Sequence, residues 1–431
     1  MKPSTFEHGV HPSDAKDQTA DLPTQRLPFG KRYVLLLGQH IGRPSKEIVE
    51  VGQRVLRGQR VADPQGFVST ALHSPVTGTV VRIARFRHPT GSLLPGLEIE
   101  TDPWDDQAVH AQIPEPADLV KVVQDGGLVG LGGAAFPSHV KYQLPEGRRC
   151  KVLVLNGCEC EPYLTSDHRT MVEQPEAVLR GIELVASRLG ADRAVVGIEG
   201  NKPEAIEALQ RAMGERSLPI ELHPLAVKYP QGAEKMLIHA LFGLEIPAGK
   251  LPLDLELVVN NVSTMAAVAE WVDKGIPLVD RTVTVSGPGV SRPANLRVPI
   301  GTPIRDLLRF CGAREEGVQV VMGGPMMGMP VTALDAPVLK GTSGLLVFPA
   351  PEKAHDAAGP CIRCARCLDA CGYHLNPSLF GRLSRAGFVD EMEQWNVMDC
   401  MECGACTWAC PSDIPLVQLI KAAKLTIRSR K

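Results

Sequence analysis

The apolar positions of this 431-residue chain fall into short continuous runs and into stretches with a helical period. Residues 33–37 and 152–155 are apolar runs with the length of buried strands. Further along, apolar side chains recur every three or four residues: Val178, Ile182, Val185 and Leu189. This period predicts a helix that ends at Gly190, and the segment AVVGIEG after it predicts a strand.

The alternation of strands and helices predicts an α/β domain over residues 111–275. Within it, LELVVNNVST predicts a strand over 255–259, and the strand at 152–155 is followed closely by Glu159 and Glu161. Ligands of α/β sheets bind beyond the carboxyl ends of the strands. We therefore expect a binding site at this end of the sheet.

The remaining segments predict four further parts of a multidomain α/β protein. Residues 1–30 are polar and predict an extended arm. In residues 31–110, VGQRVLRGQRVAD and HSPVTGTVVRI resemble the two halves of a biotinyl/lipoyl-type barrel-sandwich hybrid, without a carrier lysine between 58 and 76. Residues 276–350 predict two strands, a turn and a short helix, which resemble a β-grasp (SLBB-like) module. Residues 355–431 end in an amphipathic helix, PLVQLIKAAKLTIRSRK, and hold most of the cysteines.

The composition indicates a folded, loop-rich chain, because 44% of the residues are apolar and 41 glycines accompany 36 prolines. A net charge of -2 gives no overall field that would attract nucleic acid. No apolar run approaches the roughly 20 residues that span a bilayer, and residues 1–21 are too polar for a signal peptide. We expect a soluble protein that docks on a membrane only through a partner.

Eight of the twelve cysteines form two runs with the spacing C-x2-C-x2-C-x3-C. Three thiolates of one run can hold three corners of an iron–sulfur cube, and the fourth, which we expect to start a helix, reaches the other cluster. The predicted ligands are Cys361, Cys364, Cys367 and Cys410 for one [4Fe-4S] cluster, and Cys400, Cys403, Cys406 and Cys371 for the second. Zinc sites and disulfides are the alternatives, but neither requires this spacing, and disulfides are not expected without an export signal.

A glycine-rich loop, GGLVGLGGAAFP, covers residues 126–137. Such a loop lets backbone N–H groups approach a phosphate, and Lys141 adds a nearby charge. The loop matches neither GxGxxG nor GxxxxGK[ST] cleanly, so on its own it is equally well a tight turn. The segment VMGGPMMGMP at 321–330 carries no lysine, and we interpret it as a tight linker.

Three segments in this order, GLVGLGGAAFPSHVK, NGCECEP and VVNNVST, resemble the FMN- and NADH-binding motifs of the flavoprotein subunit of respiratory complex I. With the two cysteine runs after them, the chain from about residue 30 to its end resembles the C subunit of the Rnf electron-transport complex.

The resemblance implies a set of cofactor contacts. The glycine loop would cradle FMN, Lys141 would meet its phosphate, and Phe136 would contact the nicotinamide. The implied positions are Gly130, Gly132, Gly133, Ala134, Phe136, Lys141, Asn156, Glu159, Glu161, Tyr229, Gly232, Glu234, Asn260, Asn261 and Thr264. Cys158 and Ala233 stand where the complex I flavoproteins carry acidic residues.

The resemblance also implies a function. The chain would be a peripheral subunit on the cytoplasmic side of the inner membrane, passing electrons between NAD(H), FMN and two [4Fe-4S] clusters without a side-chain nucleophile. Its partners would be the membrane subunits of an Rnf-type complex and an iron–sulfur subunit, with ferredoxin as an indirect partner. Two alternatives remain: a soluble reductase that feeds a cobalamin or selenoprotein reductase, and a non-catalytic scaffold whose metal sites serve folding only.

Overall fold

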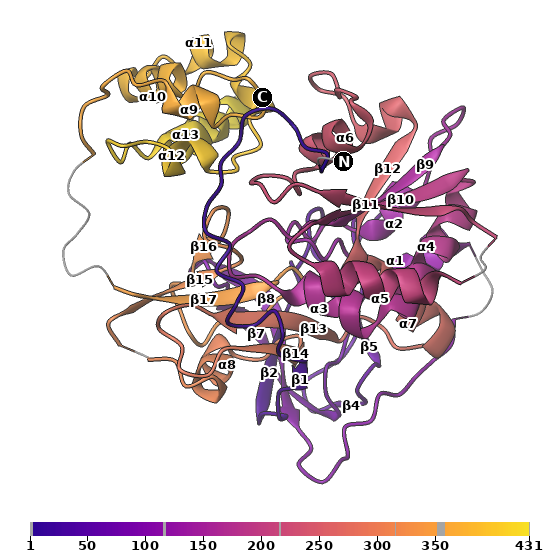
Figure 1. The fold of residues 1–431 in the computed structure, drawn as a ribbon. Helices are drawn as coiled ribbons and strands as arrows, with labels where there is room; N and C mark the ends of the chain where they lie inside the picture. Colours follow the sequence, from indigo (N-terminus) through magenta and orange to yellow (C-terminus); the bar gives the residue numbers. More distant parts are fainter. Residues whose placement is uncertain (1–2, 115–117, 215–216, 315, 351–357, 431) are drawn as a thin grey trace.

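The structure is a computed structural model, and the residues it describes are 3–114, 118–214, 217–314, 316–350 and 358–430. Residues 1–2 of the predicted arm, and 355–357 and 431 of the predicted cluster segment, lie outside the described residues. The chain folds into four successive parts, and the N-terminal arm lies along them (Figure 1).

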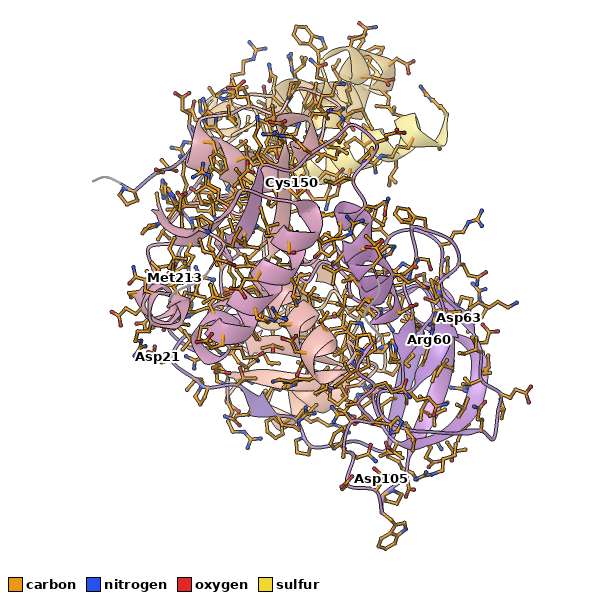
Figure 2. The ribbon with its side chains drawn as sticks, turned by 90° about the vertical axis from the view of Figure 1, so that its right-hand side faces the viewer. Asp21, Arg60, Asp63, Asp105, Cys150 and Met213 are labelled. Atoms are coloured by element: carbon orange, nitrogen blue, oxygen red, sulfur yellow. The ribbon has the colours of Figure 1, made fainter. Side chains whose placement is uncertain are left out.

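The first part is built from short strands. Their bounds are β2 Arg32–Leu36, β3 Lys46–Glu47, β4 Arg54–Val55, β5 Arg60–Asp63, β6 Leu72–His73, β7 Gly78–Arg87 and β8 Leu93–Thr101. One sheet has the order β2-β8-β7-β4 and the other β3-β5-β6. Arg60 forms an ion pair with Asp63 of the same part at 2.7 Å (Figure 2) and another with Asp125 of the next part at 3.2 Å. The second ion pair links the strand-rich part to its neighbour.

The second part is a parallel sheet covered by helices, as the pattern predicts. The strands are β9 Val152–Gly157, β10 Arg193–Glu199, β11 Ile220–Leu225 and β12 Leu257–Asn261, in the order β11-β10-β9-β12. The helices are α1 Leu119–Asp125, α2 Ser138–Tyr142, α3 Ser166–Glu173, α4 Pro175–Leu189, α5 Pro203–Met213, α6 Glu234–Phe242 and α7 Val262–Lys274. Helix α4 ends where the sequence predicts, because Gly190 adopts the left-handed conformation (φ 62°) that closes a helix.

Two strands of this sheet extend further than their apolar runs indicate. β9 continues through Gly157, and β12 is shifted from the predicted 255–259 because Pro252–Leu255 forms a 3-10 turn before it. Asn156 and Asn261 are therefore register partners at the carboxyl edge of the sheet. Side chains there share the position in which parallel sheets bind ligands.

The third part is a six-stranded sheet in the order β1-β14-β13-β17-β15-β16, in which the strands are β1 Gln25–Arg26, β13 Asp280–Ser286, β14 Ala294–Pro299, β15 Val318–Met322, β16 Met329–Pro330 and β17 Gly344–Pro349. The predicted pair of strands and short helix are β13, β14 and α8, Ile304–Phe310. Strand β1 belongs to the N-terminal arm, so the arm completes the edge of this sheet.

The C-terminal part is a small helical domain that lies beside α6 (Figure 1). Its helices are α9 Arg366–Asp369, α10 Pro377–Ala386, α11 Val389–Gln394, α12 Ala405–Trp408 and α13 Leu416–Ser429. The expectation that the fourth cysteine of each run starts a helix is wrong. The short helices α9 and α12 instead lie before Cys371 and Cys410, because the third cysteine already stands within a helical turn.

The arm is extended, and it contacts the second part and then the third. Val10 exchanges backbone hydrogen bonds with Tyr229, at 2.8 and 2.9 Å, and the hydroxyl groups of Thr19 and Thr165 lie 2.7 Å apart. The arm then enters the sheet as β1. Among the described residues, no helix has the length and apolar character needed to cross a membrane.

Candidate functional site

A cavity of about 440 Å³ opens at the carboxyl edge of the parallel sheet. Ten residues of the predicted site line it: Gly132, Gly133, Ala134, Asn156, Glu159, Glu161, Tyr229, Gly232, Glu234 and Asn261. The other five are not among its lining residues: Gly130, Phe136, Lys141, Asn260 and Thr264. The volume is within the range of about 300–1,000 Å³ that is typical of small-molecule sites.

The glycine loop presents its backbone to the cavity. Gly130 donates its N–H to the carbonyl of Phe136 at 2.8 Å, which closes the loop at its base. Gly133 has φ +110°, a conformation that favours glycine, and no atom lies within 4 Å of the position its Cβ would take. The N–H of Leu131 donates to the hydroxyl of Thr264 at 2.9 Å. Gly130, Phe136 and Thr264 therefore shape the loop from behind.

Lys141 supplies a positive charge at the wall of the cavity. Its Nζ donates to the carbonyl of Val259 at 2.9 Å and lies 3.4 Å from Oε2 of Glu234, which lines the cavity. Nearby, Asn260 is buried; its Oδ1 accepts from Tyr142 at 3.2 Å, while its Nδ2 has no partner among the described residues.

Asn261 and Asp167 form a polar network that the sequence does not reveal. Nδ2 of Asn261 and the hydroxyl of Ser263 donate to Asp167, at 2.6 and 2.5 Å, while Oδ1 of Asn261 caps α7 by accepting from Thr264 at 3.2 Å. Burial, reinforced by the charge of Glu159, raises the pKa of Asp167 to about 6. The network fixes the first turn of α7 against the cavity.

Two of the three predicted glutamates, Glu159 and Glu161, are held by backbone N–H groups. Glu159 accepts from Asp167 and His168, at 2.8 and 3.1 Å, and so caps α3. Glu161 accepts from Met326 and Met327, at 3.0 and 2.8 Å. Burial raises the pKa of Glu161, and these two N–H groups oppose the rise. Each carboxylate thus positions a wall of the cavity as well as facing it.

The segment 321–330 is not a mere linker, contrary to expectation. Residues 322–324 and 327–329 line the cavity opposite the glycine loop. A Cβ on Gly324 would lie 2.1 Å from the carboxylate of Glu161, so only glycine fits this position. Close backbone approach, and not a phosphate-binding lysine, is the reason for the glycine pair.

Asn156 and Gly232 join two walls of the cavity. Nδ2 of Asn156 donates to the carbonyl of Gly232 at 2.8 Å, and the N–H of Gly232 lies 3.3 Å from the sulfur of Cys160. A Cβ on Gly232 would meet this sulfur at 3.3 Å. The close approach explains why a glycine stands in KYPQGAEK.

The cluster domain closes the cavity on one side. The hydroxyl of Tyr229 donates to the carbonyl of Cys403 at 2.6 Å, and Met401 is part of the cavity lining. The backbone carbonyl of Met326 approaches Gly404 so closely that a Cβ there would lie 2.7 Å away. The cavity and the second cysteine run therefore share a wall.

The structure brings the eight cysteines into two groups. We call the group next to the cavity the inner set, which is Cys371, Cys400, Cys403 and Cys406; its members line one small cavity. The outer set is Cys361, Cys364, Cys367 and Cys410. Burial raises the pKa of Cys367, and the other three thiols of the outer set add to this rise. Four converging thiols form the donor set of an iron–sulfur cluster.

Two buried cations support the site and carry no recognisable signal in the sequence. Arg281 of β13 donates to the carbonyl of Leu131 in the glycine loop. Lys340 donates to the carbonyls of Ala71 and Gly127, at 2.9 and 2.6 Å, and burial lowers its pKa to about 7. Lys340 thereby joins three parts of the chain behind the loop.

The cavity is bounded by a glycine loop, and it shares a wall with a domain that holds two sets of four cysteines. These features are typical of one class of proteins, the FMN- and iron–sulfur-dependent electron-transfer proteins. Comparison with known families gives the same order of domains. The matches are an RnfC barrel sandwich hybrid domain at 4–103, a Nuo51 FMN-binding domain at 123–270, an SLBB domain at 282–330 and a 4Fe-4S dicluster domain at 357–414. These matches confirm the predicted fold class and the predicted FMN and [4Fe-4S] cofactors.

Two relatives cover nearly all of the chain. The C subunit of the proton-translocating ferredoxin:NAD(+) oxidoreductase complex of Clostridium ljungdahlii is 40% identical over an alignment 405 residues long, which covers 92% of this chain and 88% of that protein. The C subunit of the Na(+)-translocating ferredoxin:NAD(+) oxidoreductase complex of Acetobacterium woodii is 40% identical over an alignment 441 residues long, which covers 100% of this chain and 99% of that protein. The chain belongs to the family of C subunits of Rnf-type ion-translocating oxidoreductase complexes.

Solved structures show a related fold. The NAD+-reducing [NiFe]-hydrogenase in its air-oxidized state matches with a TM-score of 0.52 and 21% identity, over 75% of this chain and 70% of that chain. The H2-reduced state of such a hydrogenase matches with a TM-score of 0.51 and 22% identity, over 71% and 62%.

Proposed function

We propose that this chain passes electrons between NAD(H), an FMN held in the cavity, and an iron–sulfur partner subunit, by way of the inner and then the outer cysteine set. The observation that carries the proposal is the wall shared by the cavity and the inner set. Tyr229 lines the cavity and donates its hydroxyl to Cys403, and Met401 lines the same cavity from the inner set's own loop.

The FMN assignment is supported by the donors around the glycine loop. The loop presents the backbone at 132–134 to the cavity, and Lys141 lies at the cavity wall beside Glu234. FMN exchanges two electrons at once with nicotinamide and single electrons with iron–sulfur clusters. In our proposal Lys141 and the loop amides hold the phosphate group, and Glu161 keeps the facing loop in place.

We assign the inner set as ligands of one [4Fe-4S] cluster and the outer set as ligands of the other. The grouping of the thiols supports this assignment, because each set joins three cysteines of one run to the last cysteine of the other run. That crossing of ligands is the pattern of two-cluster ferredoxins.

The position of the outer set supports a partner at that end of the chain. Cys361 and Cys364 are exposed, and so are Ile362 and Trp408 beside cysteines of this set. A redox protein that docks there would come close to a cluster held by the outer set. The relatives are subunits of translocating complexes, so we propose membrane subunits and an iron–sulfur subunit as partners, ferredoxin as an indirect one, and a peripheral position on the cytoplasmic side of the inner membrane.

Anaerobic purification with flavin and iron counted tests the proposal directly. We expect one FMN and two clusters per chain, and bleaching of both chromophores by NADH under anaerobic conditions. Lys141→Glu should lose FMN and keep its iron, because a carboxylate would replace the cation beside Glu234. Full FMN retention in this variant would contradict the loop assignment, and a wild-type chain with neither chromophore would contradict the function.

A further inference from the structure

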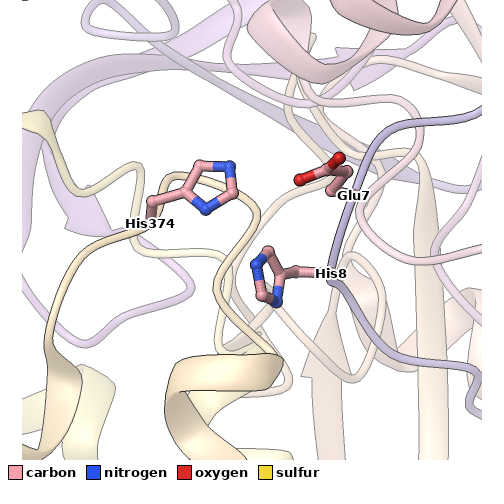
Figure 3. A group of neighbouring side chains, drawn as sticks. All are labelled: Glu7, His8 and His374. Atoms are coloured by element: carbon pink, nitrogen blue, oxygen red, sulfur yellow. The ribbon is translucent and has the colours of Figure 1, made fainter.

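A second group of metal-type side chains lies where the N-terminal arm meets the cluster domain. Glu7 and His8 belong to the arm, His374 belongs to the loop after Cys371, and all three are exposed. One ligand atom from each residue lies within 4.8 Å of the other two. Figure 3 shows the two imidazole rings and the carboxylate turned toward one another. None of the three belongs to the cysteine sets.

The histidine of the arm is already oriented by a second contact. Nδ1 of His8 lies 3.2 Å from the carbonyl oxygen of Asp369. Because a carbonyl oxygen only accepts, this contact places the proton on Nδ1 and leaves the lone pair on Nε2. Metal-binding histidines have this arrangement, in which the other ring nitrogen donates to a carbonyl or carboxylate. The rings of His8 and His374 also meet edge to face, with centroids 4.7 Å apart.

We propose that Glu7, His8 and His374 bind a divalent metal ion of the zinc class. Two imidazoles and one carboxylate form a donor set that Zn²⁺ uses with water in the fourth position, and Ni²⁺ also accepts imidazole. Bonds of about 2.1 Å to a tetrahedral ion place the ligand atoms about 3.4 Å apart, so the group has to contract by up to about 1.4 Å. Exposed side chains have the rotational freedom for this contraction.

A bound ion would fasten the arm over the inner set. Next to Glu7, Phe6 is buried in an apolar cluster with Ala233 and Met236, against which Tyr373 and Met401 also pack. The ion would link this end of the arm to the loop after Cys371. We therefore expect metal binding to protect the first residues of the arm from cleavage and exchange.

Titration of the tag-free full chain with Zn²⁺, after both clusters have been assembled so that the cysteines are occupied, tests the proposal. Competition with a chromophoric chelator measures the affinity. We expect one Zn²⁺ per chain, and a loss of affinity of at least about tenfold in His8→Ala and in His374→Ala.

His11→Ala is the matched control. His11 lies on the same arm, is exposed, and has its Nδ1 3.2 Å from the carbonyl of Val227, but it is not a member of the group. Its affinity for Zn²⁺ should equal that of the wild type. Hydrogen exchange of the arm should slow on adding Zn²⁺ in the wild type and in His11→Ala, and stay unchanged in His374→Ala. Equal Zn²⁺ binding in all these variants, or no binding in the wild type, would overturn the proposal.

Discussion

The two cysteine runs have the same spacing in sequence, but the two sets that they form have opposite surroundings in the structure. The inner set is enclosed: Tyr229 contacts Cys403, and the buried Lys424 donates to the carbonyl of Cys400 at 2.5 Å. The outer set is open, because Cys361 and Cys364 are exposed. Spacing alone therefore decides which thiols meet, and the rest of the chain decides which set faces a cofactor cavity and which faces a partner.

This difference orders the two sets along one path. A cluster enclosed beside the cavity exchanges electrons within the chain, and a cluster with exposed ligands exchanges them with another protein. The reduction potential of a cluster also depends on hydrogen bonds to its sulfur atoms and on solvent exposure. Identical spacing is thus compatible with two different potentials.

The largest expected effect comes from replacing one cysteine ligand in each of the two sets. Cys403→Ser should abolish NADH-driven reduction of the outer cluster, because the inner link is lost, whereas Cys364→Ser should leave the inner cluster reducible. Each variant should lose about half of its iron. Paramagnetic resonance of NADH-reduced samples distinguishes the two signals. Normal reduction of the outer cluster in Cys403→Ser would break the proposed order.

The sequence alone predicts the grouping of the cysteines and the position of the cavity. The features that it does not predict have physical reasons. Ligand spacing is a local property, so the grouping of Cys410 with Cys361 could be inferred from the motif alone. The glycine loop and the edge of the parallel sheet were likewise predictable, because strand ends in such sheets converge. Asn156 and Asn261 do lie at that edge.

What could not be predicted depends on contacts between segments far apart in sequence. Asp167 and Lys340 carry no motif, and they become important only because folding buries them beside the cavity and behind the loop. The segment 321–330 shows its glycines plainly, but its role depends on the carboxylate of Glu161, 165 residues away from Met326. Side-chain burial and cross-domain packing are tertiary properties that no local pattern encodes.

The buried carboxyl group of Asp167, in the lining of the cavity, predicts a pH dependence of stability. Burial raises the pKa of Asp167 to about 6, above the ordinary 3.8 of the unfolded chain. Its contribution to folding is therefore full below about pH 4 and is lost as the pH rises through about 6. The side chain in Asp167→Asn cannot ionise. Between pH 4 and 7 the unfolding free energy of the wild type should therefore fall on the order of 1–3 kcal/mol more than that of Asp167→Asn.

Urea unfolding of the wild type and Asp167→Asn from pH 5 to 8 measures the upper part of this change. Asp254 is a suitable control, because a hydrogen bond from the backbone N–H of Leu251 lowers its pKa. Its contribution is lost only as the pH falls through its own pKa, so Asp254→Asn should add no slope above pH 5. Parallel stability curves for the wild type and Asp167→Asn would show that Asp167 does not titrate in this range.

The smallest expected effect concerns one hydrogen bond between a residue of the cavity lining and the loop of the inner set. Tyr229→Phe keeps the buried ring and removes the hydroxyl that donates to Cys403 at 2.6 Å, which should lower the unfolding free energy by about 1 kcal/mol. The inner cluster signal should shift while the outer one stays. Tyr163→Phe is the control, since its ring packs on Phe348, 5.6 Å between centroids. An inner signal that moves equally in both variants would mean that this bond does not couple the cavity to the inner set.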